Sequence, residues 1–145
     1  MKKIIATILA VVLALSMCAC GAGGGNAPAV DEPAAPPDLT GEWKQINSNS
    51  DDAWQAAIIT GDTITINWVT DGGDVKSLYW AGTFVAPTTT DEPYSWDSAN
   101  DKEQTGKALL ASGDDTKTFT YADGQLSYEA SALGTTMTIR MEKVG

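Results

Sequence analysis

The most reactive side chains in this sequence are two thiols, Cys18 and Cys20, which are separated by a single alanine. No cysteine follows them in the 145 residues, and the chain contains no histidine. One intervening residue would strain a disulfide between the two thiols, so we do not expect that bond. The role of these cysteines must therefore be read from the residues around them.

The segment before the cysteines has the composition of an export signal. Lys2 and Lys3 precede an apolar run from Ile4 to Leu15, which is too short to cross a bilayer as a helix. A positively charged start, a short apolar core and small residues at the end are typical of a secretory signal peptide. A lone membrane segment with incidental thiols is the alternative.

The stretch Met17-Cys18-Ala19-Cys20-Gly21 resembles the lipobox of bacterial lipoproteins. Ala19 is the small residue expected before the modified cysteine, and Met17 stands where leucine is usual. The resemblance implies that residues 1–19 are a lipoprotein signal peptide and that Cys20 becomes the lipid-bearing first residue, with a diacylglycerol thioether and palmitate among its acyl chains. Two acyl chains anchor a protein stably, which implies a place on the outer face of the bacterial cytoplasmic membrane.

Residues 20–37 begin with Cys20 and continue as a run rich in glycine, alanine and proline. Such a composition predicts a tether, which as a coil would reach on the order of 20–25 Å. The globular part is then residues 38–145, which we expect to be β-rich.

Catalytic groups are scarce in the globular part. Without histidine or a second thiol, catalysis would need a carboxylate pair or a serine with a lysine. Asp51-Asp52 and Asp114-Asp115 lie in polar turns, where nothing apolar would raise a pKa for acid catalysis. We therefore expect no enzyme, no catalytic residue and no cofactor, and a carboxylate hydrolase is the remaining alternative.

Metal and nucleic-acid binding are also disfavoured. The acidic groups at Asp97, Asp101 and Glu103 and at Asp71 and Asp74 do not follow the alternating spacing of a calcium loop, so no metal site is expected. Loss of Lys2 and Lys3 with the signal would change the formal net charge from −10 to −12. A negative chain is repelled by nucleic acid, and its charge keeps it soluble.

From residue 38 onward, short segments alternate apolar and polar residues, which predicts strands. Asp123-Gly124 is the clearest hairpin turn between two of them. The fold class is therefore all-β: an antiparallel up-and-down meander of about eight strands, closed or nearly closed into a small barrel, with a sandwich as the alternative. The predicted strands are residues 41–46, 54–59, 62–71, 75–85, 108–112, 116–121, 125–131 and 135–144.

Residues 86–106 interrupt this rhythm as a long connection without periodicity. Connections of this length in a compact domain are usually functional or disordered, and the aromatic content favours packing against the barrel. Tyr94 and Trp96, with Asp97 and Asp101 nearby, are the candidate binding residues. The alternative is that the two aromatic residues only hold the loop in place.

Gly41-Glu42-Trp43 resembles the Gly-x-Trp opening of the first strand in lipocalins and other calycins, including avidin-like barrels. The resemblance implies a barrel in which an arginine of the last strand stacks on that tryptophan. Arg140, the only arginine of the chain, lies on the last predicted strand. A stack of Arg140 on Trp43 would be a cation–π contact of about 0.5–2 kcal/mol.

These expectations lead to an exported, membrane-anchored lipoprotein with a non-enzymatic binding domain for an unknown ligand. The alternative is a lipoprotein that binds and inhibits or excludes another protein at the cell surface. A ligand-sized cavity in the barrel would favour the first function, whereas a filled barrel would favour the second.

Overall fold

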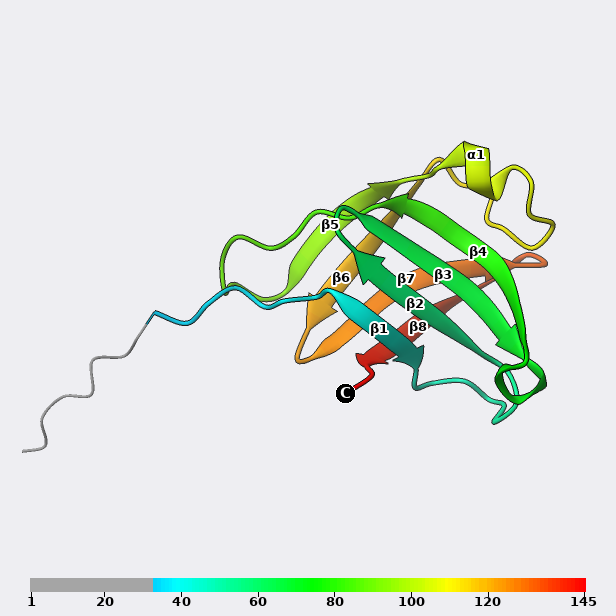
Figure 1. Ribbon diagram of the computed structural model, residues 1–145, viewed down its shortest axis with the longest axis horizontal. Helices are drawn as coiled ribbons and strands as arrows, with labels where there is room; N and C mark the ends of the chain where they lie inside the picture. The colour runs from blue at the N-terminus through cyan, green and yellow to red at the C-terminus, as the bar shows by residue number, and fades with distance from the viewer. Residues whose placement is uncertain (1–32) are drawn as a thin grey trace, which may run out of the picture. The chain divides into compact units, whose positions relative to one another are not determined.

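The computed structural model describes residues 33–145. The expectations for the signal peptide, for the lipidation of Cys20 and for most of the tether lie outside these residues. The described residues form eight strands and two short helical turns (Figure 1), with these bounds: β1 Gly41–Gln45, β2 Trp54–Thr60, β3 Thr63–Thr70, η1 Asp71–Gly73, β4 Val75–Thr83, β5 Tyr94–Ala99, α1 Lys102–Thr105, β6 Thr116–Ala122, β7 Gln125–Ala132 and β8 Thr135–Lys143.

All eight strands belong to one sheet, in the order β4-β3-β2-β1-β8-β7-β6-β5, and every pairing is antiparallel. Consecutive strands are neighbours except at one place, and the first strand pairs with the last. The sheet curls into a nearly closed barrel whose two edge strands, β4 and β5, meet at a seam (Figure 1). The prediction of an all-β meander of about eight strands is confirmed.

Alternation of side chains explains why these segments are strands. In β7, Leu126, Tyr128 and Ala130 are buried inside the barrel, while Ser127 and Glu129 face outward. A period of two puts successive residues on opposite faces of a sheet. The predicted hairpin at Asp123-Gly124 joins β6 to β7 as expected.

The interior of the barrel is filled with large side chains. Trp80 and Phe119 are 0 % exposed, and Trp43 is 2 % exposed. Burial of such aromatic residues contributes a large share of the hydrophobic stabilisation of a small domain. The other members of this core are Leu39, Ala57, Ile59, Ile64, Ile66, Tyr79, Phe84, Trp96, Leu126, Tyr128, Ala130, Ile139 and Met141.

A bulge in β4 brings two adjacent aromatic residues into the core. The pairing shifts from Ile66↔Trp80 to Asn67↔Leu78, which leaves Tyr79 as an extra residue without a partner. Because a bulge breaks the alternation, Tyr79 and Trp80 both lie inside the barrel. The bulge thus explains why buried residues stand at successive positions of β4 and not at every second one.

One predicted strand was wrong, and one strand was missed. Residues 108–112 do not form a strand, and Leu109 and Leu110 there are exposed. Instead, Tyr94–Ala99 inside the expected loop 86–106 forms β5, which pairs with β6, and α1 follows it. The inward face of β5 ends in the small polar Ser98, so its alternation of apolar and polar residues was too weak to recognise.

Individual hydrogen bonds link the edges at the seam, where only one isolated bridge, Gly82↔Asn100, forms among the described residues. Three alternate carbonyls of β4 accept hydrogen bonds from the segment that begins in β5. These are Ser112 N to Tyr79 O at 2.8 Å, Asp101 N to Ala81 O at 2.8 Å and Trp96 Nε1 to Thr83 O at 3.3 Å. The segment from β5 to residue 112 therefore covers an edge that would otherwise expose unpaired carbonyls.

Within residues 33–145, no helix has the length and apolar character needed to cross a membrane.

Candidate functional site

Tyr94 and Trp96 are part of the barrel wall. Trp96 is 5 % exposed and lies between Phe84 and Phe119, with ring centroids 5.1 and 5.2 Å away. Tyr94 stacks on Trp96, donates its hydroxyl to Val85 O at 2.7 Å, and has its pKa raised by burial. β5 turns the Trp96 side chain into the core, so this candidate binding residue is not exposed, and it packs in the barrel as its aromatic character favours.

Asp97 and Asp101 are engaged in local hydrogen bonds. Asp97 lies on the outer face of β5 and accepts the hydroxyl of Thr118 at 2.6 Å. Asp101 caps α1 by accepting the backbone N–H of Glu103 at 3.0 Å, and it also accepts the Gln104 side chain at 2.7 Å. The hydrogen bond from Gln104 holds the pKa of Asp101 below its ordinary value. Both carboxylates thus have structural partners.

The acidic residues of the described part do not gather into a catalytic or metal-binding cluster. Each Asp and Glu of residues 33–145 is exposed except Asp101, which is half-buried. Asp115 pairs with Lys102 at 3.1 Å on the surface. Residues 33–145 contain no group of three or more His, Cys, Asp or Glu side chains placed to hold a metal ion.

Gly41 and Trp43 occupy special positions, but Arg140 does not join them. Gly41 has φ 128°, a backbone conformation that other residues rarely adopt. The Trp43 indole donates Nε1 to Leu39 O at 2.9 Å and meets the edge of Tyr121 at 6.2 Å. Arg140 is exposed, because it alternates with the buried Ile139 and Met141 and thus faces outward. The expected stack of Arg140 on Trp43 is therefore not formed.

A buried cation inside the barrel was missed at the sequence level. The Lys117 side chain is 5 % exposed and its Nζ lies 3.0 Å from Asp114 Oδ2 and 3.1 Å from Glu129 O. The same Nζ stands 5.4 Å from the Tyr79 ring and 5.3 Å from the Trp80 ring. The alternation Lys117, Phe119 on one face of β6 could have revealed it. Such a paired cation fixes β6 and the preceding turn against β4.

Polar side chains form a small buried cluster beside this lysine. Tyr128 donates its hydroxyl to Gln55 Oε1, and Gln45 Oε1 accepts the backbone N–H of Gln55 at 2.8 Å. Gln55 Nε2 and Tyr79 OH, both fully enclosed, have no hydrogen-bond partner. Burial, together with the nearby Tyr79, raises the pKa of Tyr128 well above its ordinary value, so its hydroxyl stays protonated.

A recess of about 270 Å³ opens at the end of the barrel near the β1–β2 loop. Its walls include Gln45, Trp68, Met137 and Ile139 and loop residues 47–50. A second hollow, of about 250 Å³, lies on the outer face of β1–β3, where Lys44 Nζ stands 4.1 Å from the Trp54 ring. Neither hollow is in the centre of the barrel, which the aromatic core fills.

Exposed apolar side chains gather at one end of the barrel, where β1 and β3 end and the β7–β8 turn lies. Within residues 33–145, nine large hydrophobic residues are exposed. Six of the nine belong to this end, which we name the apolar end: Ile46, Val75, Leu109, Leu110, Leu133 and Met137. Leu109 and Leu133 are 101 % and 106 % exposed, so they contribute no burial to the fold. Isolated exposed leucines are common, whereas a contiguous exposed apolar patch is typical of an interaction site.

No protein-family model, curated protein or solved structure matches this chain.

Proposed function

We propose that this chain is an exported, lipid-anchored and non-enzymatic lipoprotein that binds another protein with the outside of its barrel. The observation that carries the proposal is the filled interior: Trp43, Trp80 and Phe119 occupy the space that a lumen ligand would need. Tyr94 and Trp96 support the same conclusion, because they complete the wall instead of lining an opening. Recognition then has to use surface residues.

The anchor is the second part of the proposal. Cys20, as the lipid-bearing residue, would hold the barrel at the outer face of the cytoplasmic membrane, at a distance set by residues 20–37. Inhibition or exclusion of a membrane or surface protein needs no catalytic group and no cavity. The exposed and separate carboxylates give no support to the hydrolase alternative.

The experiment uses the full-length protein in intact cells. We expect chemical cross-linking to produce a discrete adduct with a different protein, and we expect Cys20→Ser to release the chain from the envelope fraction and to abolish the adduct. The chain is also purified in detergent without cross-linker, and co-purified small molecules are identified by mass spectrometry. A stoichiometric small molecule without any protein adduct would overturn the proposal.

A binding domain for a small ligand remains a second candidate because of the recess of about 270 Å³ at the apolar end. Its walls combine the apolar Trp68 and Met137 with the polar Gln45 and Asn47. An apolar wall with a few polar groups suits a small neutral ligand with hydrogen-bonding groups. The mass-spectrometric arm of the experiment separates this function from protein binding.

A further inference from the structure

Leu133 occupies a turn position that suits a different residue. The β6–β7 and β7–β8 turns have the same geometry: φ is 53° and 78° at Asp123 and Gly124, and 52° and 79° at Leu133 and Gly134. Two positive φ values define a hairpin turn whose first position favours Asn, Asp or Gly. Asp123 follows this preference and Leu133 does not. The leucine is strained by its backbone and fully exposed, and neither property helps the fold.

Leu109 and Leu110 are presented in a similar way by a turn that is fixed at both ends. Ala111 N donates to Ala108 O at 3.3 Å, which places the two leucines at the tip of the turn. After the turn, Ser112 N donates to Tyr79 O at 2.8 Å. A pre-organised tip loses little conformational entropy when it binds.

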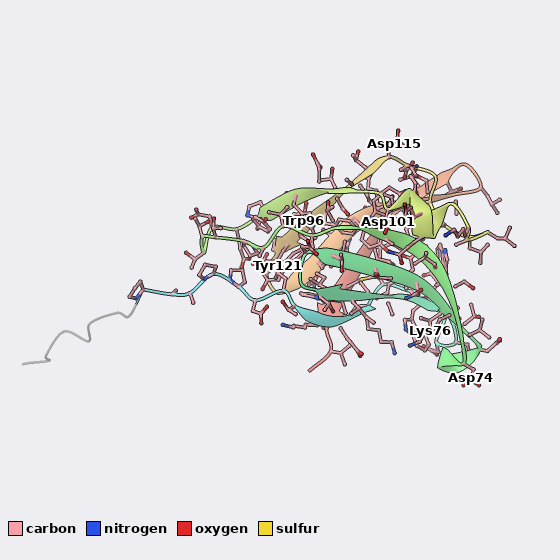
Figure 2. All side chains as sticks on the ribbon, turned by 45° about the horizontal axis from the view of Figure 1, so that its top comes forward. Asp74, Lys76, Trp96, Asp101, Asp115 and Tyr121 are labelled. Atoms are coloured by element: carbon pink, nitrogen blue, oxygen red, sulfur yellow. The ribbon has the colours of Figure 1, made fainter. Side chains whose placement is uncertain are left out.

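These two tips lie at the same end of the barrel, opposite to the end at which residues 33–40 lie. In Figure 1 the β7–β8 turn and the segment between α1 and β6 are both at the right, whereas residues 33–40 enter from the left. Figure 2 places Trp96 and Tyr121 toward the tether side and Asp74 at the far end. Strands of nine residues, such as β8, span roughly 30 Å, so the tips are far from the end of the barrel at which residues 33–40 lie.

Acidic side chains surround the apolar end. They come from the β1–β2 loop, from η1 and from the turn before β6. They are Asp51, Asp52, Asp71, Asp74, Asp114 and Asp115, all exposed. Lys102 and Lys117 pair with two of them, and Lys76 and Lys107 are exposed at the same end, so these six acids outnumber the four bases. An acidic rim repels a second copy of this acidic chain and an anionic membrane surface, and it attracts a basic surface.

We infer that the apolar end docks onto a different protein, one that offers an apolar recess bordered by lysine or arginine, and that Leu109 and Leu133 are the side chains that insert. This inference rests on the proposed function and names the surface and the partner chemistry. Protein–protein interfaces usually have a buried apolar centre and a polar rim. Inserted leucines with acidic residues around them would have this arrangement.

The test places a photo-cross-linking amino acid, p-benzoylphenylalanine, in the full-length chain in intact cells. Separate variants carry it at Leu109, at Leu133, at Val85 and at Ile58. The last two are matched controls, because they are exposed hydrophobic residues outside the apolar end, with exposed fractions of 55 % and 41 %. We expect one heteromeric adduct from the first two positions and none from the controls.

A second substitution measures the contribution of the leucine side chain. With the probe at Leu109, Leu133→Asn is expected to reduce the adduct about tenfold, as for loss of an interface anchor. Higher salt should reduce it further, because the rim acts through charge. A urea unfolding curve of the same variant must show unchanged or increased stability, which excludes loss of folding as the cause.

The outcomes separate the inference from the proposed function. A protein adduct from Val85 or Ile58 but not from the leucines overturns the inference and leaves protein binding in place. A lipid adduct or a homodimeric adduct at Leu109 and Leu133 also overturns the inference, since it would mean that a membrane or a second copy of this chain covers the apolar end. No protein adduct at any position, together with none by chemical cross-linking, overturns both.

Discussion

The indole Nε1 of Trp80 donates a hydrogen bond of 3.0 Å to Ser98 Oγ, and this buried contact joins the two edge strands. Trp80 belongs to β4 and Ser98 to β5, which do not pair along their length. Gly82 lies beside the contact, and its absent side chain lets the two edges approach. The barrel is thus closed here by side chains in place of a ladder.

Gly82→Ala should destabilise the protein through this contact. A Cβ at Gly82 would lie 2.4 Å from Ser98 Oγ and 2.5 Å from Ala99 O, so the edges must separate. We expect a loss of about 1–3 kcal/mol in the free energy of unfolding, measured by urea denaturation. Gly113→Ala is the control, because a Cβ there meets nothing within 4 Å. Equal stabilities for the two variants would contradict this explanation of the seam.

Trp96→Ala should lower stability by about 3–5 kcal/mol, since a large buried aromatic residue is removed from between two others. Tyr94→Phe loses only a hydrogen bond to Val85 O and should cost about 1 kcal/mol. Thermal unfolding followed by near-UV circular dichroism measures both. A Trp96→Ala variant as stable as the wild type would mean that β5 does not pack as described.

Tyr79→Phe and Tyr128→Phe should differ although both delete a buried hydroxyl. The Tyr79 hydroxyl has no partner, so its removal should be neutral or slightly stabilising. Tyr128→Phe leaves the buried Gln55 Oε1 without its hydrogen-bond donor and should lower the free energy of unfolding by about 1–3 kcal/mol. Urea denaturation of both variants checks the difference, and a large loss for Tyr79→Phe would show that its hydroxyl is bound by water or a ligand.

Asp114 should make part of the stability depend on pH. The hydrogen bond from Ser112, followed by that from Lys117, holds the pKa of Asp114 below its ordinary value of 3.8. Its contribution to stability is therefore present above that value and is lost as the pH falls through the lower native pKa. We expect Asp114→Asn to reduce the fall of the urea midpoint at acidic pH. Above neutral pH, the dependence of the midpoint on pH should be the same as in the wild type. The same dependence in variant and wild type would exclude this carboxylate as a source.

Leu133→Asn and Asp123→Leu form a reciprocal pair. Asparagine relieves the strain at φ 52° and should stabilise the protein, whereas leucine at φ 53° should destabilise it. We expect changes of about 1 kcal/mol in opposite directions by urea denaturation. A loss of stability in Leu133→Asn would show that Leu133 is held by the fold and would remove the argument that it serves a partner.

The sequence was sufficient for the architecture because most strands show a clear period of two. The sites were harder to predict, for a physical reason that Trp96 illustrates. A tryptophan beside charged residues in a stretch without periodicity reads as exposed, but a strand places every second side chain on the other face. Ser98, small and polar, occupies the inner position where an apolar residue would have revealed the strand.

Arg140 and Leu109 show two further limits. The stack of Arg140 on Trp43 does not form because Arg140 alternates with the buried Ile139 and Met141, an alternation that the resemblance did not take into account. Leu109 and Leu110 were assigned to a strand because apolar residues are normally buried. Their exposure could be recognised only after the strands around them were placed.

The pairing of β1 with β8 has a consequence for biogenesis. Lys44 pairs with Glu142 across that ladder, so the first strand lacks one neighbour until β8 has been synthesised. A nascent chain of the first hundred residues contains β1 with one edge unpaired, so the sheet cannot close into a barrel. Closure of the barrel therefore requires residues 135–143, so a nascent chain that ends before β8 cannot yet hold the native fold.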